Sequence, residues 1–188
     1  MTVMNARQLF ITIFVMFASF GCRKDASQPI ISIPNGDFEL WDNMPILYDW
    51  RTNSCPVCVP PYETYIVQRV TAAAHGQFAA KFTYNNVYSS WADNKFSIPL
   101  HPGFLTGYIK SNIANGDTAT IHVALFSGNN LVDGGDFYET SSTISYKKIE
   151  IIISQTSSMA DSASIKIVGG KKIGTELFID NLEFIKNH

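Results

Sequence analysis

The sequence is poor in the residues that metal centres and nucleic-acid interfaces require. Its 188 residues include three cysteines and four histidines. The histidines are scattered and there is no second cysteine pair, so a four-thiolate zinc site is not expected. Lys and Arg number 14 against 16 Asp and Glu, a formal net charge of −2. Without the basic stripe that a phosphate backbone needs, nucleic acid is not an expected partner.

Motifs of catalysis are also missing. The chain has no Gly-x-Ser-x-Gly elbow, no zinc-binding histidine pair at helical spacing and no phosphate-binding glycine loop. Glycosidic hydrolysis needs two carboxylates at a set separation. No such pair stands out among the acidic candidates Glu39, Glu63, Asp93, Asp133, Asp136 and Glu139. We therefore expect a protein that binds a ligand rather than an enzyme.

The apolar run near the N-terminus is too short for a membrane-spanning helix. It follows Arg7 and ends in small residues before Cys22, which is the pattern of a secretory signal. The Gly21-Cys22 ending resembles the lipobox of bacterial lipoproteins, in which that thiol is acylated and becomes the first residue of the mature protein. The alternative is an ordinary secretory signal with an incidental cysteine.

This pattern divides the chain into a signal peptide over residues 1–21, a polar tether over residues 22–29 and a domain over residues 30–188. Several acyl chains on Cys22 would anchor the protein durably in the cell envelope, at the outer membrane. The Lys24-Asp25 pair partly resembles the surface-export tag of Bacteroidota lipoproteins. We expect a monomer with one domain, because the mature part has a common single-domain size.

The two remaining cysteines stand three positions apart, at Cys55 and Cys58. In an exported protein this spacing favours a structural disulfide over a redox pair or half of a zinc site. A thioredoxin-like role would place the motif at the start of a helix, whereas Val59-Pro60-Pro61 forces an extended chain. Free thiols or a metal remain the alternatives.

Period-two alternation dominates the chain after residue 30, and helical periodicity is almost absent. The clearest strand covers 118–127. Further strands are expected at 64–70, 79–84, 94–98, 104–111, 149–153, 163–167 and 177–185. Strands at this short spacing, without crossover helices, predict an all-β fold of two packed antiparallel sheets.

Asn115-Gly116-Asp117 stands between two of these strands. Asn and Gly tolerate positive φ, which makes the segment a strong hairpin signal. In such a hairpin Ile109 would face Val123, so that apolar meets apolar. Lys110 would face His122 on the polar side.

Five segments, taken in order, carry a resemblance to a known family. They are Asn35-Gly36-Asp37-Phe38-Glu39-Leu40-Trp41, Tyr48-Asp49-Trp50, His75-Gly76-Gln77-Phe78-Ala79-Ala80-Lys81-Phe82, Leu105-Thr106-Gly107-Tyr108-Ile109-Lys110 and Leu177-Phe178-Ile179-Asp180-Asn181-Leu182-Glu183-Phe184. Together they resemble carbohydrate-binding modules of the galactose-binding-like β-sandwich class, and domains assigned to carbohydrate metabolism in Bacteroidota lipoproteins. The resemblance spans nearly all of residues 34–185 and implies an antiparallel jelly-roll β-sandwich that binds a glycan.

The resemblance also implies a structural calcium ion that pins the first and last strands together. In similar modules the Glu of the opening motif and the Asp of the closing strand supply carboxylates, which correspond here to Glu39 and Asp180. Calcium takes about six to eight oxygen ligands. Backbone carbonyls and a ligand near residues 76–81 would have to complete the shell.

The residues themselves indicate an irregularity at Asp180-Asn181. The apolar residues on its two sides fall in opposite phases of the alternation: Leu177 and Ile179 before it, Leu182 and Phe184 after it. Continuous contact with the core requires a slip of one residue, which a β-bulge provides. The alternative is a solvated kink.

Aromatic rings that stack on pyranose faces are the usual basis of sugar binding. Trp91 and Tyr88 lie in the polar segment 85–94, which has no apolar periodicity to hide their rings, so we expect an exposed binding loop. Three further candidates share the polar phase of the predicted hairpin: Tyr108, Lys110 and His122. Trp41 and Trp50 belong to the opening motif and are expected to cap the core.

The sequence thus predicts a lipid-anchored glycan-binding protein of the cell envelope. The alternative is a structural or adhesin-like envelope lipoprotein whose partner is a protein, and a glycan hydrolase with unrecognised carboxylates is less favoured. Trp91 and Tyr88 exposed over a groove would favour a glycan. A flat apolar patch would favour a protein partner, and carboxylates that face one another would favour an enzyme.

Overall fold

The structure, a computed structural model, describes residues 30–44, 46–55, 66–153 and 159–186. The predicted signal peptide, the tether with Cys22, and Cys58 lie outside these residues, so lipidation and the Cys55–Cys58 disulfide remain predictions. The described residues form no helix, so they contain no helix that is long and apolar enough to cross a membrane.

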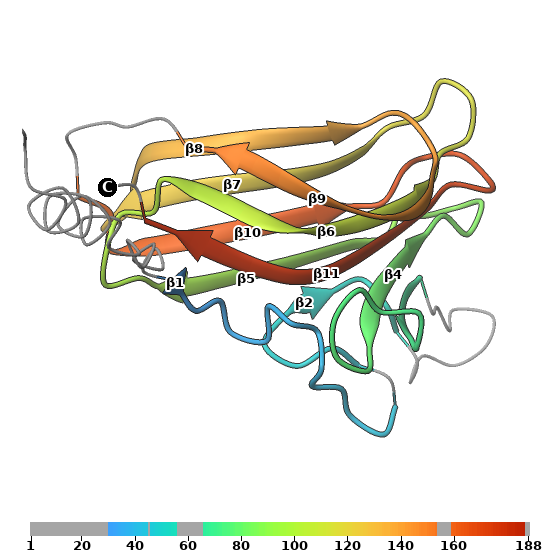
Figure 1. Cartoon of the computed structure of the whole chain (residues 1–188), viewed down its shortest axis with the longest axis horizontal. Coiled ribbons are helices and arrows are strands. Elements are labelled where there is room, and N and C mark those ends of the chain that lie inside the picture. Colours follow the sequence, from blue (N-terminus) through green and yellow to red (C-terminus); the bar gives the residue numbers. More distant parts are fainter. Residues whose placement is uncertain (1–29, 45, 56–65, 154–158, 187–188) are drawn as a thin grey trace, which may run out of the picture.

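The described chain forms strands joined by turns and loops (Figure 1). The strands are β1 Ile30–Ile31, β2 Arg51–Thr52, β3 Val67–Val70, β4 Ala79–Thr83, β5 Trp91–Ser97, β6 Phe104–Asn112, β7 Ala119–Ser127, β8 Asn130–Glu139, β9 Thr143–Ile152, β10 Ser162–Val168 and β11 Glu176–Ile185. Sheet I has the order β3-β4-β11-β6-β9, with β1 beside β11, and sheet II has the order β2-β5-β10-β7-β8. All pairings are antiparallel.

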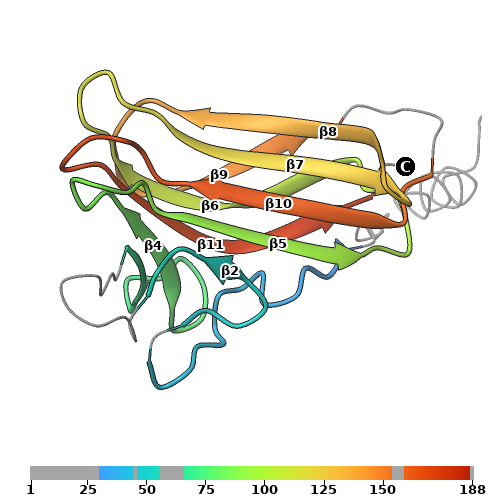
Figure 2. The same ribbon diagram turned by 180° about the vertical axis from the view of Figure 1, so that it is seen from behind.

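The two sheets are stacked face to face, with sheet I toward the viewer in Figure 1 and sheet II toward the viewer in Figure 2. From β4 to β11 the chain passes back and forth between them, and the order β4-β11-β6-β9 lies over β5-β10-β7-β8. This arrangement of eight strands is a jelly roll. The predicted all-β, antiparallel jelly-roll sandwich is confirmed.

Alternate residues of both sheets fill the core between them. Ile109 on β6 is fully buried and Val123 on β7 is 4% exposed. Burying one such side chain stabilises the fold by about 1.5–3 kcal/mol. The strands predicted at 118–127, 104–111 and 163–167 correspond closely to β7, β6 and β10.

The predicted hairpin between β6 and β7 is wrong. β6 lies in sheet I, between β11 and β9, whereas β7 lies in sheet II, between β10 and β8. Ile109 and Val123 both face the core, but from opposite sheets. Alternation reports which side of a strand is buried, and it is the same whether the partner strand lies beside it or across the core. Lys110 and His122 therefore lie on opposite outer faces.

A tight hairpin does form one connection later, between β7 and β8. Ser127 pairs with Asn130, which leaves a two-residue loop, and Gly128 in that loop has φ +60°. A positive φ at the first loop position suits glycine and matches the twist of the two strands. β8 itself was missed by the sequence analysis, because Gly134 and Gly135 interrupt its alternation.

Asn115-Gly116-Asp117 forms a turn that crosses from one sheet to the other. The buried Asp117 carboxylate accepts hydrogen bonds from the backbone N–H groups of Lys171 and Lys172, at 2.8 and 2.9 Å. The Thr175 hydroxyl donates a third bond at 2.6 Å. Burial alone would raise the pKa of Asp117, but these hydrogen bonds together lower it below its ordinary value.

The opening motif closes one side of the core, as predicted for its tryptophans. Trp50 is 4% exposed, and its ring centroid lies 5.3 Å from that of Phe38. Its indole N–H donates to the Asn35 carbonyl at 3.1 Å. The Trp41 indole packs against the core and donates to the Phe38 carbonyl at 2.6 Å.

The predicted bulge in the closing strand is confirmed. The register between β11 and β6 shifts between Asp180 and Glu183, and Asn181 has φ +49°. Leu177 and Leu182, on the two sides of the shift, are 1% and 2% exposed. The bulge thus keeps both halves of β11 in contact with the core and turns Asp180 to the outer side of sheet I.

Candidate functional site

The outer face of sheet II has the side chains that best fit a ligand site. Along β5, Ala92 and Asn94 are buried in the sandwich. The alternate residues Trp91, Asp93 and Lys95 therefore project to the outside. The polar phases of β10, β7 and β8 project on the same side, because these strands lie next to one another in the sheet.

Strand register aligns one outward residue from each of the five strands into a row across sheet II. This charged row consists of Arg51, Asp93, Lys166, His122 and Asp136. Cross-strand neighbours lie about 5 Å apart, close enough for their side chains to interact. The row thus crosses the whole sheet and alternates positive with negative groups at both ends.

A second row runs directly beside the first. This aromatic row consists of Trp91, Val168, Thr120 and Tyr138. Its two rings stand on β5 and β8, three strand spacings apart, which is about 14 Å at the usual ~4.8 Å between strands. Val168 and Thr120 form a low floor between the rings. The spacing suits a short oligosaccharide better than a single sugar.

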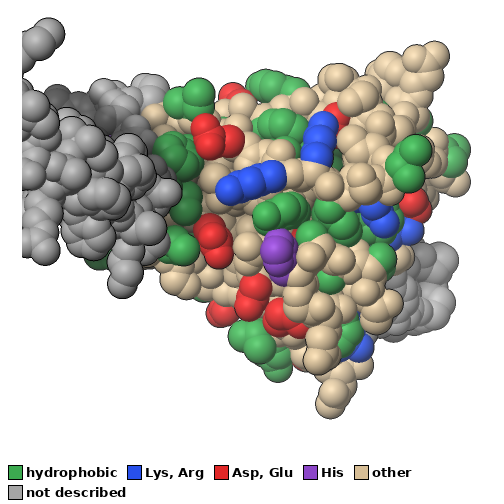
Figure 3. Space-filling view, in the orientation of Figure 1, with side chains coloured by type: hydrophobic (Ala, Val, Ile, Leu, Met, Phe, Trp, Pro, Cys, Tyr) green, Lys and Arg blue, Asp and Glu red, His purple; other side chains and the backbone are tan. Residues whose placement is uncertain are grey.

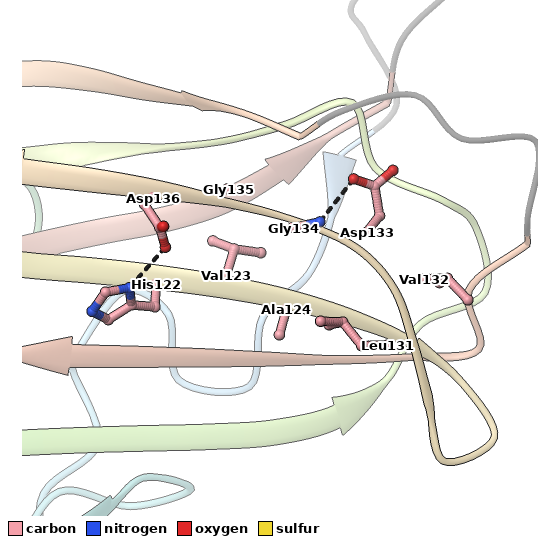
Figure 4. Close-up of a pocket in the computed structure, with 9 residues that line it drawn as sticks. All are labelled: His122, Val123, Ala124, Leu131, Val132, Asp133, Gly134, Gly135 and Asp136. Atoms are coloured by element: carbon pink, nitrogen blue, oxygen red, sulfur yellow. Dashed lines mark hydrogen bonds and ion pairs between the residues drawn. The ribbon is translucent and has the colours of Figure 1, made fainter.

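An ion pair fixes one end of the charged row and a hydrogen-bonded His–Asp pair fixes the other. Arg51 donates from Nε and Nη2 to the two oxygens of Asp93, at 2.9 and 2.5 Å, and these bonds raise the pKa of Arg51. At the other end His122 Nδ1 lies 2.7 Å from Asp136 Oδ1, and the two side chains point toward each other across β7 and β8 (Figure 4). The Tyr138 hydroxyl donates to the same carboxylate at 3.3 Å.

The two rings differ in how openly they are presented. Trp91 is partly buried, and two cations flank its indole: the Arg51 guanidinium carbon lies 5.6 Å and Lys166 Nζ 5.9 Å from the ring centroid. Cation–π attraction at this range fixes the orientation of a ring. Tyr138 is 58% exposed and meets His122 edge to face, with centroids 6.3 Å apart. Tyr138 is therefore the more accessible stacking surface.

Hollows open along the two rows. One of about 560 Å³ lies between β7 and β8 and is lined in part by His122 and Asp136 (Figure 4). Another of about 580 Å³ is lined by His122, Tyr138 and Lys171, among others. A third, of about 400 Å³, surrounds the Arg51 end of the charged row. Because His122 borders the first two, a ligand could occupy both.

The structure separates the predicted ligand residues into two groups. The predicted exposed loop ends before Trp91, which begins β5 and is partly buried, so that part of the prediction is wrong. Trp91 and His122 share the outer face of sheet II, as part of the aromatic and charged rows. Tyr88, 57% exposed, lies in the turn that precedes β5, where its N–H bonds the Asn85 side chain. Tyr108 and Lys110 project from sheet I on the opposite side, so the predicted shared face with His122 is wrong.

Sequence reasoning missed Asp93, Lys166, Asp136 and Tyr138 as members of the face. Lys166 could have been found, because Ala163, Ile165 and Ile167 already defined the buried phase of its strand. Asp136 and Tyr138 belong to β8, for which no strand was expected. Their alignment depends on which strands pair, and alternation alone does not encode that pairing.

On the outer face of sheet I, Lys110 and Lys81 are occupied by contacts within the molecule. Lys110 Nζ lies 4.2 Å from the centroid of the Phe178 ring. Lys81 pairs with Glu176 at 2.5 Å. The rings of Tyr108 and His75 meet with centroids 4.5 Å apart. Figure 3 shows basic, acidic and hydrophobic side chains interspersed over this face, without one large patch of a single kind.

Glu39 and Asp180 both hold one loop against sheet I. Asp180 Oδ2 accepts the N–H groups of Ala74 and His75, each at 2.7 Å. Glu39 Oε1 accepts the N–H groups of Gln77 and Phe78 at 2.7 and 3.0 Å. Burial raises the pKa of Asp180 despite its hydrogen bonds, and burial followed by the Asp180 charge raises that of Tyr146.

These two carboxylates are the ones that the resemblance assigns to calcium. Asp180 Oδ1 is buried and has no hydrogen-bond partner in the described part of the chain, which fits a cation ligand. Glu39 Oε1 is already engaged by two amides, and Gly76, with φ +66°, lets the loop pass against it. Among the described residues no group of three His, Cys, Asp or Glu side chains comes together, so carbonyl oxygens would have to supply most of the shell.

No family model and no curated protein matches this chain. Solved structures do match. TmCBM61, solved in complex with beta-1,4-galactotriose, gives a TM-score of 0.56 at 16% identity, over 82% of this chain and 97% of that one. The enzymatically active domain of tailspike protein 4 from bacteriophage CBA120 gives 0.53 at 16% identity, over 82% of this chain and 21% of that one.

An apo form cyclase from Fischerella sp. gives a TM-score of 0.51 at 12% identity, over 87% of this chain and all of that one. At such identities the likenesses establish the β-sandwich fold. A sugar complex and enzymes both occur among them, so function has to be argued from the residues of this chain.

Proposed function

We propose that this chain is a glycan-binding protein of the cell envelope and that the glycan lies on the outer face of sheet II. The aromatic row is the observation that carries the proposal. Trp91 and Tyr138 would stack on sugar rings, and the charged row beside them would hydrogen-bond the hydroxyls. The sugar complex of TmCBM61, which has the same fold, supports this class of ligand.

The same face argues for binding over hydrolysis. The two carboxylates of the charged row, Asp93 and Asp136, belong to β5 and β8, three strand spacings or about 14 Å apart. Glycosidases hold their carboxyl pair about 5–10 Å apart. Each of the two is also engaged by a cationic or imidazole partner, Arg51 or His122. We therefore propose that the protein is not an enzyme.

A glycan array followed by titration with the full-length protein tests the proposal. Trp91→Ala and Tyr138→Ala should each lower the affinity for a bound oligosaccharide about tenfold or more, since each removes a stacking surface. Tyr108→Ala on sheet I is the matched control and should bind as the wild type does. Loss of binding in Tyr108→Ala alone would move the site to sheet I. A blank array with folded protein would favour an envelope-protein partner instead.

Anchoring to the outer membrane through Cys22 belongs to the same proposal, and the lipobox-like sequence supports it. Cells that express the protein should incorporate radiolabelled palmitate into the wild type and not into Cys22→Ala. Labelling of both would point to another acylated group, and labelling of neither to a secretory signal with an incidental cysteine.

A structural calcium ion held by Glu39 and Asp180 is proposed as well, supported by the unpartnered Oδ1 of Asp180. The ion would neutralise buried carboxylate charge and tie the opening motif to β11. A bound ligand at 100 times its dissociation constant stabilises a fold by about 2.7 kcal/mol. Millimolar CaCl₂ should therefore raise the melting temperature relative to chelator, and Asp180→Asn should abolish that rise.

A further inference from the structure

The charged row contains a cation that makes no ion pair with the described residues. Asp93 is paired with Arg51, and Asp136 is paired with His122. Lys166 stands between these pairs in the row, is exposed, and makes no ion pair with any residue that the structure describes. The Lys166 ammonium at the centre of the face is thus left to solvent or to a ligand.

A second lysine reaches the same region. Lys171 is exposed and lines the hollow that Tyr138 and His122 also border. Its backbone N–H binds Asp117, whereas its ammonium has no ion-pair partner within the described chain. Two uncompensated lysines on one face contrast with the net charge of −2 of the whole chain.

Lys166 lies next to the proposed stacking surface. Its Nζ lies 5.9 Å from the centroid of Trp91, so an anion bound there would lie beside the ring on which a sugar stacks. Other lysines are differently occupied: Lys81 and Lys147 pair with Glu176 and Glu139. Lys166 and Lys171 have no such partner among the described residues and lie beside the aromatic row.

We propose that the outer face of sheet II selects an anionic sugar, whose carboxylate or sulfate group is bound by Lys166 and Lys171. This inference rests on the proposed glycan-binding function of the same face. An ammonium offers three donors and a compact charge to the oxygens of such a group. A neutral sugar would stack on the aromatic row and accept hydrogen bonds from the charged row, but it would neutralise neither ammonium.

Three probes test the inference with the full-length protein: a neutral galactose oligomer, an oligomer of galacturonic acid and a sulfated galactose oligomer. We expect an acidic oligomer to bind about tenfold more tightly than the neutral one at low salt. The preference should shrink as NaCl is added, because exposed charges are screened. The two acidic probes distinguish a carboxylate from a sulfate ligand.

Substitutions of single lysines on the two sheets test which lysine causes the preference for an acidic oligomer. Lys166→Gln should weaken binding of the acidic oligomer about fivefold and that of the neutral oligomer much less, because the glutamine amide still donates a hydrogen bond to a hydroxyl but has no charge. Lys166→Arg keeps the charge and should retain most of the preference. Lys148→Gln removes an exposed lysine from β9 of sheet I that makes no ion pair with described residues, and it should have no effect. Melting curves of all variants verify that they are folded.

The outcomes separate this inference from the function on which it rests. If neutral and acidic oligomers bind with equal affinity and Trp91→Ala abolishes the binding of both, the selection of anions is overturned. Glycan binding by this face then still stands. An acidic preference that Lys148→Gln and Lys166→Gln reduce equally would also overturn it, because the charge would then act without a site. Failure of all three oligomers and of the array would overturn both proposals.

Discussion

The outer faces of the two sheets contain similar residues and use them differently. On sheet I the carboxylate of Asp180 is fully buried under the 74–78 loop, and Lys81 and Lys110 are occupied by an acidic partner and a ring. On sheet II the carboxylate of Asp136 is exposed and Lys166 has no counterion among the described residues. Aromatic and charged composition alone does not distinguish a structural face from a binding face.

The two faces differ in whether other groups of the chain pair with, or hydrogen-bond to, their charged side chains. The 74–78 loop donates four backbone N–H groups to the carboxylates on sheet I. A carboxylate that receives such bonds stabilises the fold and is withdrawn from a glycan. The hollows beside Tyr138 and His122 leave the corresponding groups of sheet II accessible. Substitutions on the two faces should therefore affect different measurements.

The largest expected effect is on sheet I. Asp180→Ala removes the acceptor of two partly buried backbone N–H groups and empties a buried site, which should cost about 3 kcal/mol of unfolding free energy in urea denaturation. Burial raises the folded-state pKa of Asp180, so the wild type gains stability as the pH falls through that pKa. The cost of the substitution should accordingly grow toward acid pH.

Asp136→Ala on sheet II is the matched control for this experiment. Its carboxylate is exposed, so the unfolding free energy should change by no more than about 0.5 kcal/mol, while glycan affinity should fall because His122 and Tyr138 lose their common partner. Equal destabilisation by Asp180→Ala and Asp136→Ala would contradict the distinction between a structural and a binding face.

A smaller effect is expected at Asp117, where the chain crosses from sheet I to sheet II. Asp117→Asn should cost about 2 kcal/mol at neutral pH, because four donors lose a charged acceptor. Its folded-state pKa is lowered, so the stabilisation is complete above the unfolded value of about 3.9 and is lost as the pH falls through the folded one. The cost should shrink toward acid pH, opposite to that of Asp180→Ala. If the costs of Asp117→Asn and Asp180→Ala change with pH in the same direction, the opposite pKa shifts given to these two carboxyl groups are wrong.

The fold and one irregularity of it could be predicted from the sequence because both depend on alternation. Alternation indicates which side of each strand is buried, and this gave an antiparallel sandwich. The phase change between Ile179 and Leu182 even located the bulge at Asp180-Asn181. Such features are local, so a single strand contains the information that specifies them.

The pairing of strands could not be obtained in the same way. β6 and β7 are separated by a good turn, yet they belong to different sheets. Ile109 and Val123 are buried equally well whether β6 and β7 pair in one sheet or face each other across the core. The predicted β6–β7 hairpin wrongly placed Tyr108 and Lys110 on the face of His122. It also gave no sign of the charged row to which Lys166 and Asp136 belong. The candidate site is a property of register across five strands, which the order of residues along one strand does not specify.

The smallest expected effect compares one ion pair from each face. The Arg51 side chain is 75% exposed and that of Lys81 is 20% exposed. An exposed pair contributes little, since solvent screens it and two long side chains lose freedom. Arg51→Gln should therefore leave the melting temperature unchanged within error, whereas Lys81→Gln should lower it measurably. Arg51→Gln should instead weaken glycan binding about two- to threefold, because the guanidinium helps to orient Trp91. A lower melting temperature with unchanged binding in Arg51→Gln would show that the Arg51 end of the charged row is structural, and would confine the ligand to the part of sheet II around His122 and Tyr138.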